Sequence, residues 1–171
     1  VAYDPCGIGA SADAARDELP RSVEALAADA AEVARAAGLA SGAHVLGFSL
    51  GGMIAQQVAS GGAGFRLLSL TLCATSLGGD EASGPPPGFL DLLAGWGDWP
   101  DQREALAARF LAHAVGPASW AASHGKFLQQ ASRRFAAERR SGPAIAAQAE
   151  AISRFAAGSE LAEVLSGNDA S

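Results

Sequence analysis

An apolar, strand-like run that leads directly into a Gly-x-Ser-x-Gly motif constrains this chain more than any other feature. Residues 44–53 read HVLGFSLGGM, with the serine at position 49. A serine on a sharp turn between a strand and a helix holds its hydroxyl clear of the backbone, where it can attack an electrophile. Gly47 and Gly51 suit the flanks, because we expect the backbones to crowd together there. The motif therefore predicts a nucleophile elbow, with Ser49 as the nucleophile.

The first 76 residues alternate between strand and helix patterns. The expected order is a strand ending at 1–4, a helix at 23–37, a strand at 43–48, a helix at 51–60 and a strand at 66–74. Ser22 suits the N-cap of the first helix, and Gly38 suits its end. The alternation predicts a parallel sheet, and the apolar 43–48 strand indicates helices on both faces. Ligands bind such sheets at the carboxyl ends of the strands, where Ser49 and the loop at 7–11 both fall.

The pattern changes after Ser76. A connector rich in glycine and proline covers 78–88, and the apolar spacing beyond it is helical. Helices are expected at 89–93, 102–114, 120–140 and 143–155, with Trp96, Trp99 and Trp120 as packing anchors. We expect these helices to form a cap. The predicted division is an α/β core segment at 1–76, a helical cap at 77–160 and the start of a return to the core sheet at 161–171.

Charge and hydropathy narrow the classes of partner. The formal net charge is -6, from 12 Lys+Arg against 18 Asp+Glu, and no basic patch is interleaved with aromatic residues. Nucleic acid is therefore not an expected partner, and the basic pairs at 133–134 and 139–140 are expected on a solvated helix face. No apolar run approaches the roughly 20 residues of a membrane span, and Val1 does not begin a leader pattern. We expect a cytoplasmic protein with no membrane partner.

Neither a metal site nor a nucleotide site is predicted. Cys6 and Cys73 form no metal-binding pattern; two reduced cysteines are expected, with Cys73 in the core, and a disulfide is left open. Residues 7–12 (GIGASA) mimic a dinucleotide-binding fingerprint, and Asp29 follows at a suitable spacing. That fingerprint should open a helix directly, whereas here Pro20 separates the loop from the helix. No metal and no cofactor are therefore expected.

Several segments resemble the α/β-hydrolase superfamily. They are YDPCGIGAS at 3–11, the helix containing Asp29, HVLGFSLGGMIAQQVA at 44–59 and RLLSLTLCATS at 66–76, with a weaker similarity at 144–164. The best match is the branch of small esterases, lactonases and methylesterases that carry a helical cap. The resemblance implies a partial α/β-hydrolase fold, a parallel sheet with flanking helices plus a helical cap, in an incomplete chain. The family usually has arginine where this chain has Cys6.

The resemblance also implies roles for particular residues. Ser49 would be the nucleophile, and the backbone N–H of Leu50 would be one donor of the oxyanion hole. The second donor comes from an earlier loop that is missing before Val1. The triad acid and histidine follow the serine in chain order, and Asp169, within VLSGND, is the candidate acid. No histidine follows Asp169, and the histidine base and its acid are both expected outside this sequence.

The three histidines of the chain are weaker candidates for the base. His44 lies within the predicted strand, where a hydrogen-bonded strand histidine is the expected reading. His113 and His124 lie in the helical region, before the position that the family order requires. Either could act on Ser49 only if the cap brought it there, since geometry and not chain order identifies a base.

The resemblance implies a serine hydrolase that cleaves a carboxylic ester or lactone of a small apolar acyl compound through an acyl-enzyme at Ser49. As an isolated stretch the chain is expected to be inactive. The alternative is a non-catalytic, truncated relative that acts as a binding module or has no stable function. A C–C bond hydrolase or a perhydrolase would share the same elbow. The oligomeric state is left open, although exposed strand edges and apolar faces predict a poorly soluble or oligomeric chain.

Overall fold

In the residues that the structure describes, two strands and a larger set of helices form a mixed α/β fold, seen here as a computed structural model. The structure describes residues 1–13, 19–61, 65–79, 82, 84–85, 87–95, 102–114, 116–157 and 161. The chain divides into two compact units. Unit 1 consists of Val1–Pro5, Pro20–Gly84 and Glu150–Ser171, and unit 2 consists of Cys6–Leu19 and Pro85–Ala149. The functional division into core, cap and return segment stays a prediction.

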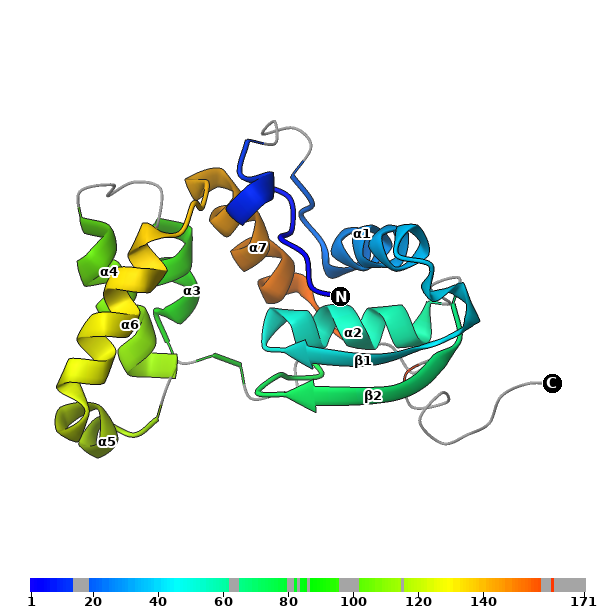
Figure 1. The fold of residues 1–171 in the computed structure, drawn as a ribbon. Coiled ribbons are helices and arrows are strands. Elements are labelled where there is room, and N and C mark those ends of the chain that lie inside the picture. The colour runs from blue at the N-terminus through cyan, green and yellow to red at the C-terminus, as the bar shows by residue number, and fades with distance from the viewer. Residues whose placement is uncertain are drawn as a thin grey trace. The chain divides into compact units, whose positions relative to one another are not determined.

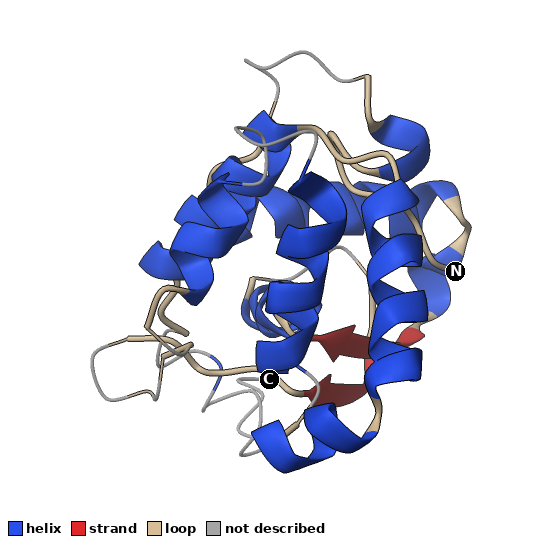
Figure 2. Ribbon diagram, turned by 90° about the vertical axis from the view of Figure 1, so that its left-hand side faces the viewer, coloured by secondary structure: helices blue, strands red, loops and turns tan. Residues whose placement is uncertain are grey.

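The elements follow one another along the chain as Figure 1 labels them. They are η1 (Gly9–Ser11), α1 (Val23–Ala36), η3 (Leu39–Ser41), β1 (Ala43–Phe48), α2 (Leu50–Ser60), β2 (Leu67–Cys73), α3 (Phe89–Ala94), α4 (Arg103–Ala114), α5 (Ala118–Ser123), α6 (Gly125–Ala137) and α7 (Gly142–Arg154). Figure 2 shows how far helix outweighs strand in the described chain. None of the helices within the described ranges has the length and apolar character needed to cross a membrane.

The sheet of unit 1 is a parallel pair of strands. Strand β1 pairs with β2 in a register that places Val45 opposite Leu70 and Phe48 opposite Cys73. Helix α2 connects them and packs on both, as the alternation of the sequence predicts. The predicted bounds of β1 are confirmed, and those of β2 are one residue too wide at each end.

Helix α1 packs against α2 and completes the core of unit 1. The Ser22 hydroxyl accepts a hydrogen bond from the Ala25 N–H at 3.2 Å, which confirms the predicted N-cap. Val23 and Leu26 of α1 are each 1% exposed and share a buried cluster with Met53 of α2. Burial of this apolar face, more than helix propensity, stabilises so short a helix.

One face of the sheet is open, contrary to the prediction that helices cover both. Leu46 and Phe48 of β1 are 71% and 65% exposed, and their partners in β2, Thr71 and Cys73, are also exposed. The prediction of a buried strand end at 1–4 is likewise wrong: these residues form no strand, and Val1 is 89% exposed. The face is open because α2 is the helix that packs on the strand pair, whereas residues 1–4 form no strand because, among the described residues, β1 pairs with β2 alone.

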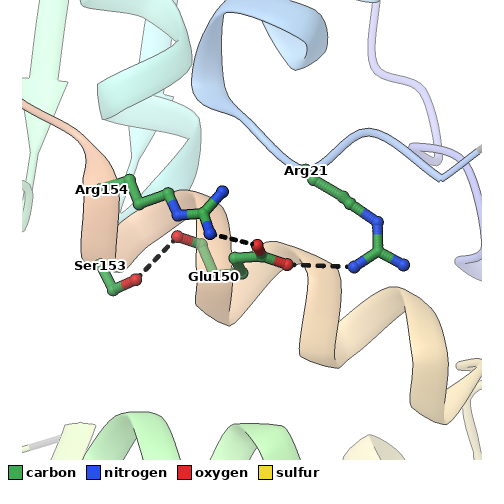
Figure 3. A network of polar contacts seen from close by, with 4 residues as sticks. All are labelled: Arg21, Glu150, Ser153 and Arg154. Atoms are coloured by element: carbon green, nitrogen blue, oxygen red, sulfur yellow. Dashed lines mark hydrogen bonds and ion pairs between the residues drawn. The ribbon is translucent and has the colours of Figure 1, made fainter.

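The last turns of α7 and the residue after it complete unit 1. Ala151 and Phe155 belong to the buried cluster of Val23 and Leu26. Glu150 is the centre of a polar network, shown in Figure 3: its carboxylate accepts from Arg21 at 3.1 Å and from Arg154 at 2.7 Å. Because both arginines are mostly exposed, these ion pairs add little stability. The apolar contacts hold this segment in place.

Unit 2 is helical. Leu106 and Ala107 of α4 pack with Ile145 of α7, and Leu92 and Phe135 lie against them. A second buried cluster joins Leu19 to Ala144 and Ala147, with Ile8 and Cys6 packed on it. The Phe110 ring is tilted against Phe89 and stacked on Phe135, with ring centroids 5.1 Å apart in both pairs. Aromatic and aliphatic packing together therefore hold the helices of this unit.

The single helix predicted over 120–140 is wrong. The helix is interrupted at His124, which separates α5 from α6, and α6 ends at Ala137. Arg140 then turns inward, with its guanidinium 3.7 Å from the Phe135 ring centroid and only 10% of its side chain exposed. Burial lowers the pKa of Arg140, although the Glu138 carboxylate opposes that shift. The predicted solvated face holds for Arg139, which is 60% exposed and pairs with Asp13, but not for Arg140.

Candidate functional site

Ser49 stands on a sharp turn between the end of β1 and the start of α2. Its backbone has φ 53° and ψ -121°, a combination that L-residues rarely adopt. The strand–turn–helix context predicted from the motif is therefore present. Such a conformation costs roughly 1–3 kcal/mol and persists only where surrounding contacts hold it.

Both backbone groups of Ser49 are held by hydrogen bonds. Its N–H donates to the Cys73 carbonyl at 2.9 Å, which extends the pairing of β1 with β2 into the turn. Its carbonyl accepts from the N–H groups of Gly52 at 2.8 Å and Met53 at 3.3 Å. The same carbonyl also accepts from the Thr75 hydroxyl at 2.8 Å. The strained residue is thus tied to both β2 and α2.

The glycines around Ser49 differ in what they require. A Cβ on Gly47 would lie 2.2 Å from the Gly51 carbonyl oxygen, so the expected crowding is confirmed there. A Cβ on Gly51 would meet no described atom within 4 Å, so the crowding expected at this second flank is wrong. The tight position is instead Gly52, whose Cβ would come within 2.5 Å of the Thr75 side chain. The second position that requires glycine is therefore residue 52, one residue after the last glycine of the Gly-x-Ser-x-Gly motif.

The start of α2 offers backbone donors beside Ser49. Among the described residues, the N–H groups of Leu50 and Gly51 have no hydrogen-bond acceptor. Free amides at the N-terminus of a helix favour a developing negative charge. The Ser49 side chain is exposed, and its hydroxyl has no hydrogen-bond partner within the described ranges. An exposed serine thus directly precedes two unpaired backbone amides.

Among the described side chains, no candidate base is hydrogen-bonded to the Ser49 hydroxyl. His44 is exposed on β1, and its Nδ1 lies 2.8 Å from the Ser69 hydroxyl of β2, which confirms a hydrogen-bonded strand histidine. His124 belongs to unit 2, where its ring stacks on Trp120 with centroids 4.2 Å apart. The side chain of His113 and all of Asp169 lie outside the described residues, as do Trp96 and Trp99.

The cysteines are not joined by a disulfide. Cys6 is partly buried and packs against the Leu19 and Ala144 cluster of unit 2. Cys73 is exposed, so the prediction that it lies in the core is wrong. It ends β2 opposite Phe48, on the open face where apolar strand residues also remain accessible. Within the described ranges, no group of three or more His, Cys, Asp or Glu side chains could hold a metal ion.

The glycine-rich loop at 7–11 has a packing role in unit 2. It forms one short 3₁₀ turn and an antiparallel bridge between Ile8 and Arg140, and it does not open a helix as a dinucleotide-binding loop does. A Cβ on Gly7 would lie 2.3 Å from that of Ala144, so close packing explains this glycine. Asp29 lies in the middle of α1. Whether the loop shares an edge with Ser49 stays a prediction.

A cavity of about 260 Å³ lies in unit 1, beside β1. Its lining is mostly apolar and includes Tyr3, Val33 of α1, Leu46 of β1 and Ile54 of α2, but not Ser49. Burial raises the pKa of Tyr3, and the charge of Asp29 adds to that shift. This cavity is therefore a feature separate from the exposed Ser49 hydroxyl.

Stability should respond to the ionisation of Asp29. Partial burial, and then the charge of Glu32, raise the pKa of Asp29. The folded chain therefore holds this proton more tightly than the unfolded chain, and stability falls as pH rises from the ordinary aspartate pKa to the raised one. Asp29→Asn should reduce that fall, which begins near the ordinary aspartate pKa of about 4.

Urea unfolding of both proteins at several pH values measures the difference. Glu32→Gln serves as a second variant, because removing its charge should change the pH dependence in the same direction. An unchanged or steeper pH dependence in Asp29→Asn would contradict the prediction.

Sequence reasoning alone missed Gly52 and Thr75 as parts of this turn. The doubled glycine at 51–52 was a signal that a second close approach follows the serine. Nothing in the sequence indicated that residue 75, 26 positions later, supplies the approaching side chain.

Comparison with known proteins adds no relative to this picture. No family model matches the chain, and no curated protein matches it. The resemblance to α/β-hydrolases therefore stays a prediction from the sequence segments that carry it.

Proposed function

We propose that this chain is part of a serine hydrolase of the α/β-hydrolase type, with β1, α2 and β2 in the core and the helices after residue 77 as its cap. The observation that carries the proposal is the backbone of Ser49, held at φ 53° and ψ -121° between a strand and a helix. An exposed hydroxyl beside unpaired amides is the arrangement that acyl transfer requires. The proposed substrate is a carboxylic ester or lactone of a small apolar acyl compound.

In the proposed reaction the Ser49 oxygen attacks the carbonyl carbon while a base takes the hydroxyl proton. The Leu50 N–H stabilises the oxyanion of the tetrahedral intermediate, which collapses to an acyl-enzyme as the alcohol oxygen leaves with a proton. Water then attacks the acyl-enzyme, which releases the acid and restores the hydroxyl. The reaction requires no cofactor. It does require a base, and none is hydrogen-bonded to Ser49 among the described residues.

Covalent labelling with a fluorophosphonate tests this proposal. The chain is incubated with the probe, with and without imidazole as a diffusible base, and the modified peptide is identified by mass spectrometry. We expect one phosphonyl group on Ser49, added faster with imidazole, and none in Ser49→Ala. In a complete protein that contains its own base, Ser49→Ala should also lower hydrolysis of p-nitrophenyl acetate by on the order of 10⁴-fold.

Ser69→Ala is the matched control. Ser69 is an exposed serine of the same unit, and it already has a histidine at hydrogen-bond distance. Labelling of Ser49 should persist in this variant. Probe that attaches to Ser69, or that still attaches in Ser49→Ala, would overturn the assignment of the nucleophile.

The second candidate is a non-catalytic binding module. The absence of a described partner for the Ser49 hydroxyl favours it, because removing a triad member leaves only residual catalysis. A chain that takes up no probe at Ser49, even with imidazole, would support this candidate and exclude the hydrolase.

A further inference from the structure

We infer that Thr75 is a positioning residue that aligns the Leu50 N–H by holding the carbonyl of Ser49. The inference rests on the proposed function of Ser49 and adds to it a residue outside the motif. Thr75 lies two residues after the end of β2. Its hydroxyl donates to the Ser49 carbonyl oxygen at 2.8 Å.

The geometry of the peptide bond gives this contact its consequence. The carbonyl of Ser49 and the N–H of Leu50 belong to the same planar, trans peptide group, so they point in opposite directions. Any donor that fixes the Ser49 oxygen therefore also fixes the direction of the Leu50 N–H. Since that N–H is the proposed oxyanion donor, Thr75 acts on the site without touching the substrate.

The strained backbone of Ser49 requires hydrogen bonds that fix its carbonyl. With φ at 53° and ψ at -121°, the residue would relax if the peptide between it and Leu50 rotated. The Gly52 and Met53 amides oppose that rotation from within α2, and Thr75 opposes it from the segment after β2. Among the described residues, Thr75 is therefore the one donor to the Ser49 carbonyl that does not belong to α2.

Two further contacts hold Thr75 in place. Its side chain packs where a Cβ on Gly52 would stand, at 2.5–2.6 Å, so the glycine makes room for it. The neighbouring residue is tied to the same helix, because the Gln56 side-chain amide donates to the Ser76 carbonyl at 3.0 Å and to the Gly52 carbonyl at 3.2 Å. Gln56 is only 1% exposed, so this connection is shielded from water.

The test separates the hydroxyl of Thr75 from its bulk. Thr75→Val removes the donor and keeps the size, whereas Thr75→Ser keeps the donor and loses the methyl group. Thr71→Val, at an exposed threonine of β2, is the matched control. Two quantities are measured in the whole chain: amide hydrogen exchange at Gly52 and Met53, and the kinetics of Ser49 labelling by a fluorophosphonate in imidazole.

In Thr75→Val we expect exchange at Gly52 and Met53 to become about tenfold faster, with Val58 at the far end of α2 unchanged. The limiting rate of labelling should fall about tenfold while the probe concentration at half-saturation stays the same, because an oxyanion donor acts in the transition state. Thr75→Ser and Thr71→Val should both behave like the parent chain.

Other results would separate a failure of the inference about Thr75 from a failure of the proposed hydrolase. Unchanged exchange in Thr75→Val overturns the inference whatever the labelling shows. Faster exchange with an unchanged labelling rate also overturns it, because the contact would then be structural only. Faster exchange in a chain whose Ser49 is never labelled supports the hold of Thr75 on the turn and overturns the proposed hydrolase.

Discussion

Gly47→Ala should unfold or severely destabilise unit 1. The added methyl group would stand 2.2 Å from the Gly51 carbonyl oxygen and 2.6 Å from the Gly52 Cα. These are backbone atoms of one tight turn, so no side chain can move aside to relieve the overlap. We expect a loss of about 3 kcal/mol or more, at the upper end of overpacking, which is a large share of a typical folding free energy.

Gly51→Ala is the matched control for this effect. It makes the same chemical change in the same motif, but its methyl group would meet no described atom within 4 Å. Since Gly51 lies in the first turn of α2, alanine there should be neutral or stabilise the chain by less than about 1 kcal/mol. Urea unfolding monitored by circular dichroism measures both variants. Equal destabilisation by the two substitutions would show that crowding at Gly47 does not hold the turn.

Gly78→Ala should have a comparably large effect at a second close contact. Gly78 forms an antiparallel bridge with Ala156, and a Cβ on it would lie 2.0 Å from the Phe155 carbonyl oxygen. Phe155 is buried in the core of unit 1, so its backbone cannot retreat without loss of packing. The left-handed φ of 67° adds its own cost for alanine, and we expect about 3 kcal/mol or more in total.

Gly79→Ala separates the clash from the backbone conformation. Gly79 also has a left-handed φ, 75°, but a Cβ on it would make only an ordinary contact with Ala156 at 3.6 Å. Its substitution should therefore cost about 1 kcal/mol, the conformational part alone. Thermal unfolding of the two variants under the same conditions gives the comparison. A Gly78 variant no less stable than the Gly79 variant would contradict the proposed close contact.

The open sheet face bears on how the chain behaves in solution. Leu46 and Phe48 lie on the same strand that carries the serine turn, and both are largely exposed. A parallel sheet is ordinarily covered on both faces, so exposed apolar strand residues favour association with other apolar surfaces. Poor solubility or oligomerisation of the isolated chain stays a prediction, and Leu46 and Phe48 are the residues expected to cause it.

The local parts of this protein could be predicted from its sequence. The bounds of β1, the Ser22 cap and the turn at Ser49 are each encoded within a few neighbouring residues, by apolar spacing, a capping side chain and a glycine where backbones meet. Helix boundaries in the second half were less predictable. The break at His124 separates two helices that a continuous apolar spacing had joined.

The tertiary structure alone decided which distant segments meet. It placed Thr75 on the carbonyl of Ser49, Phe155 in the core of Val23, and Cys73 at an accessible strand end. Periodicity in a sequence records which face of an element is apolar, but not which other segment covers that face. The serine was visible in the sequence because its turn is local. The residue inferred to position it was not, because hydrogen bonds across 26 residues depend on strand register and packing.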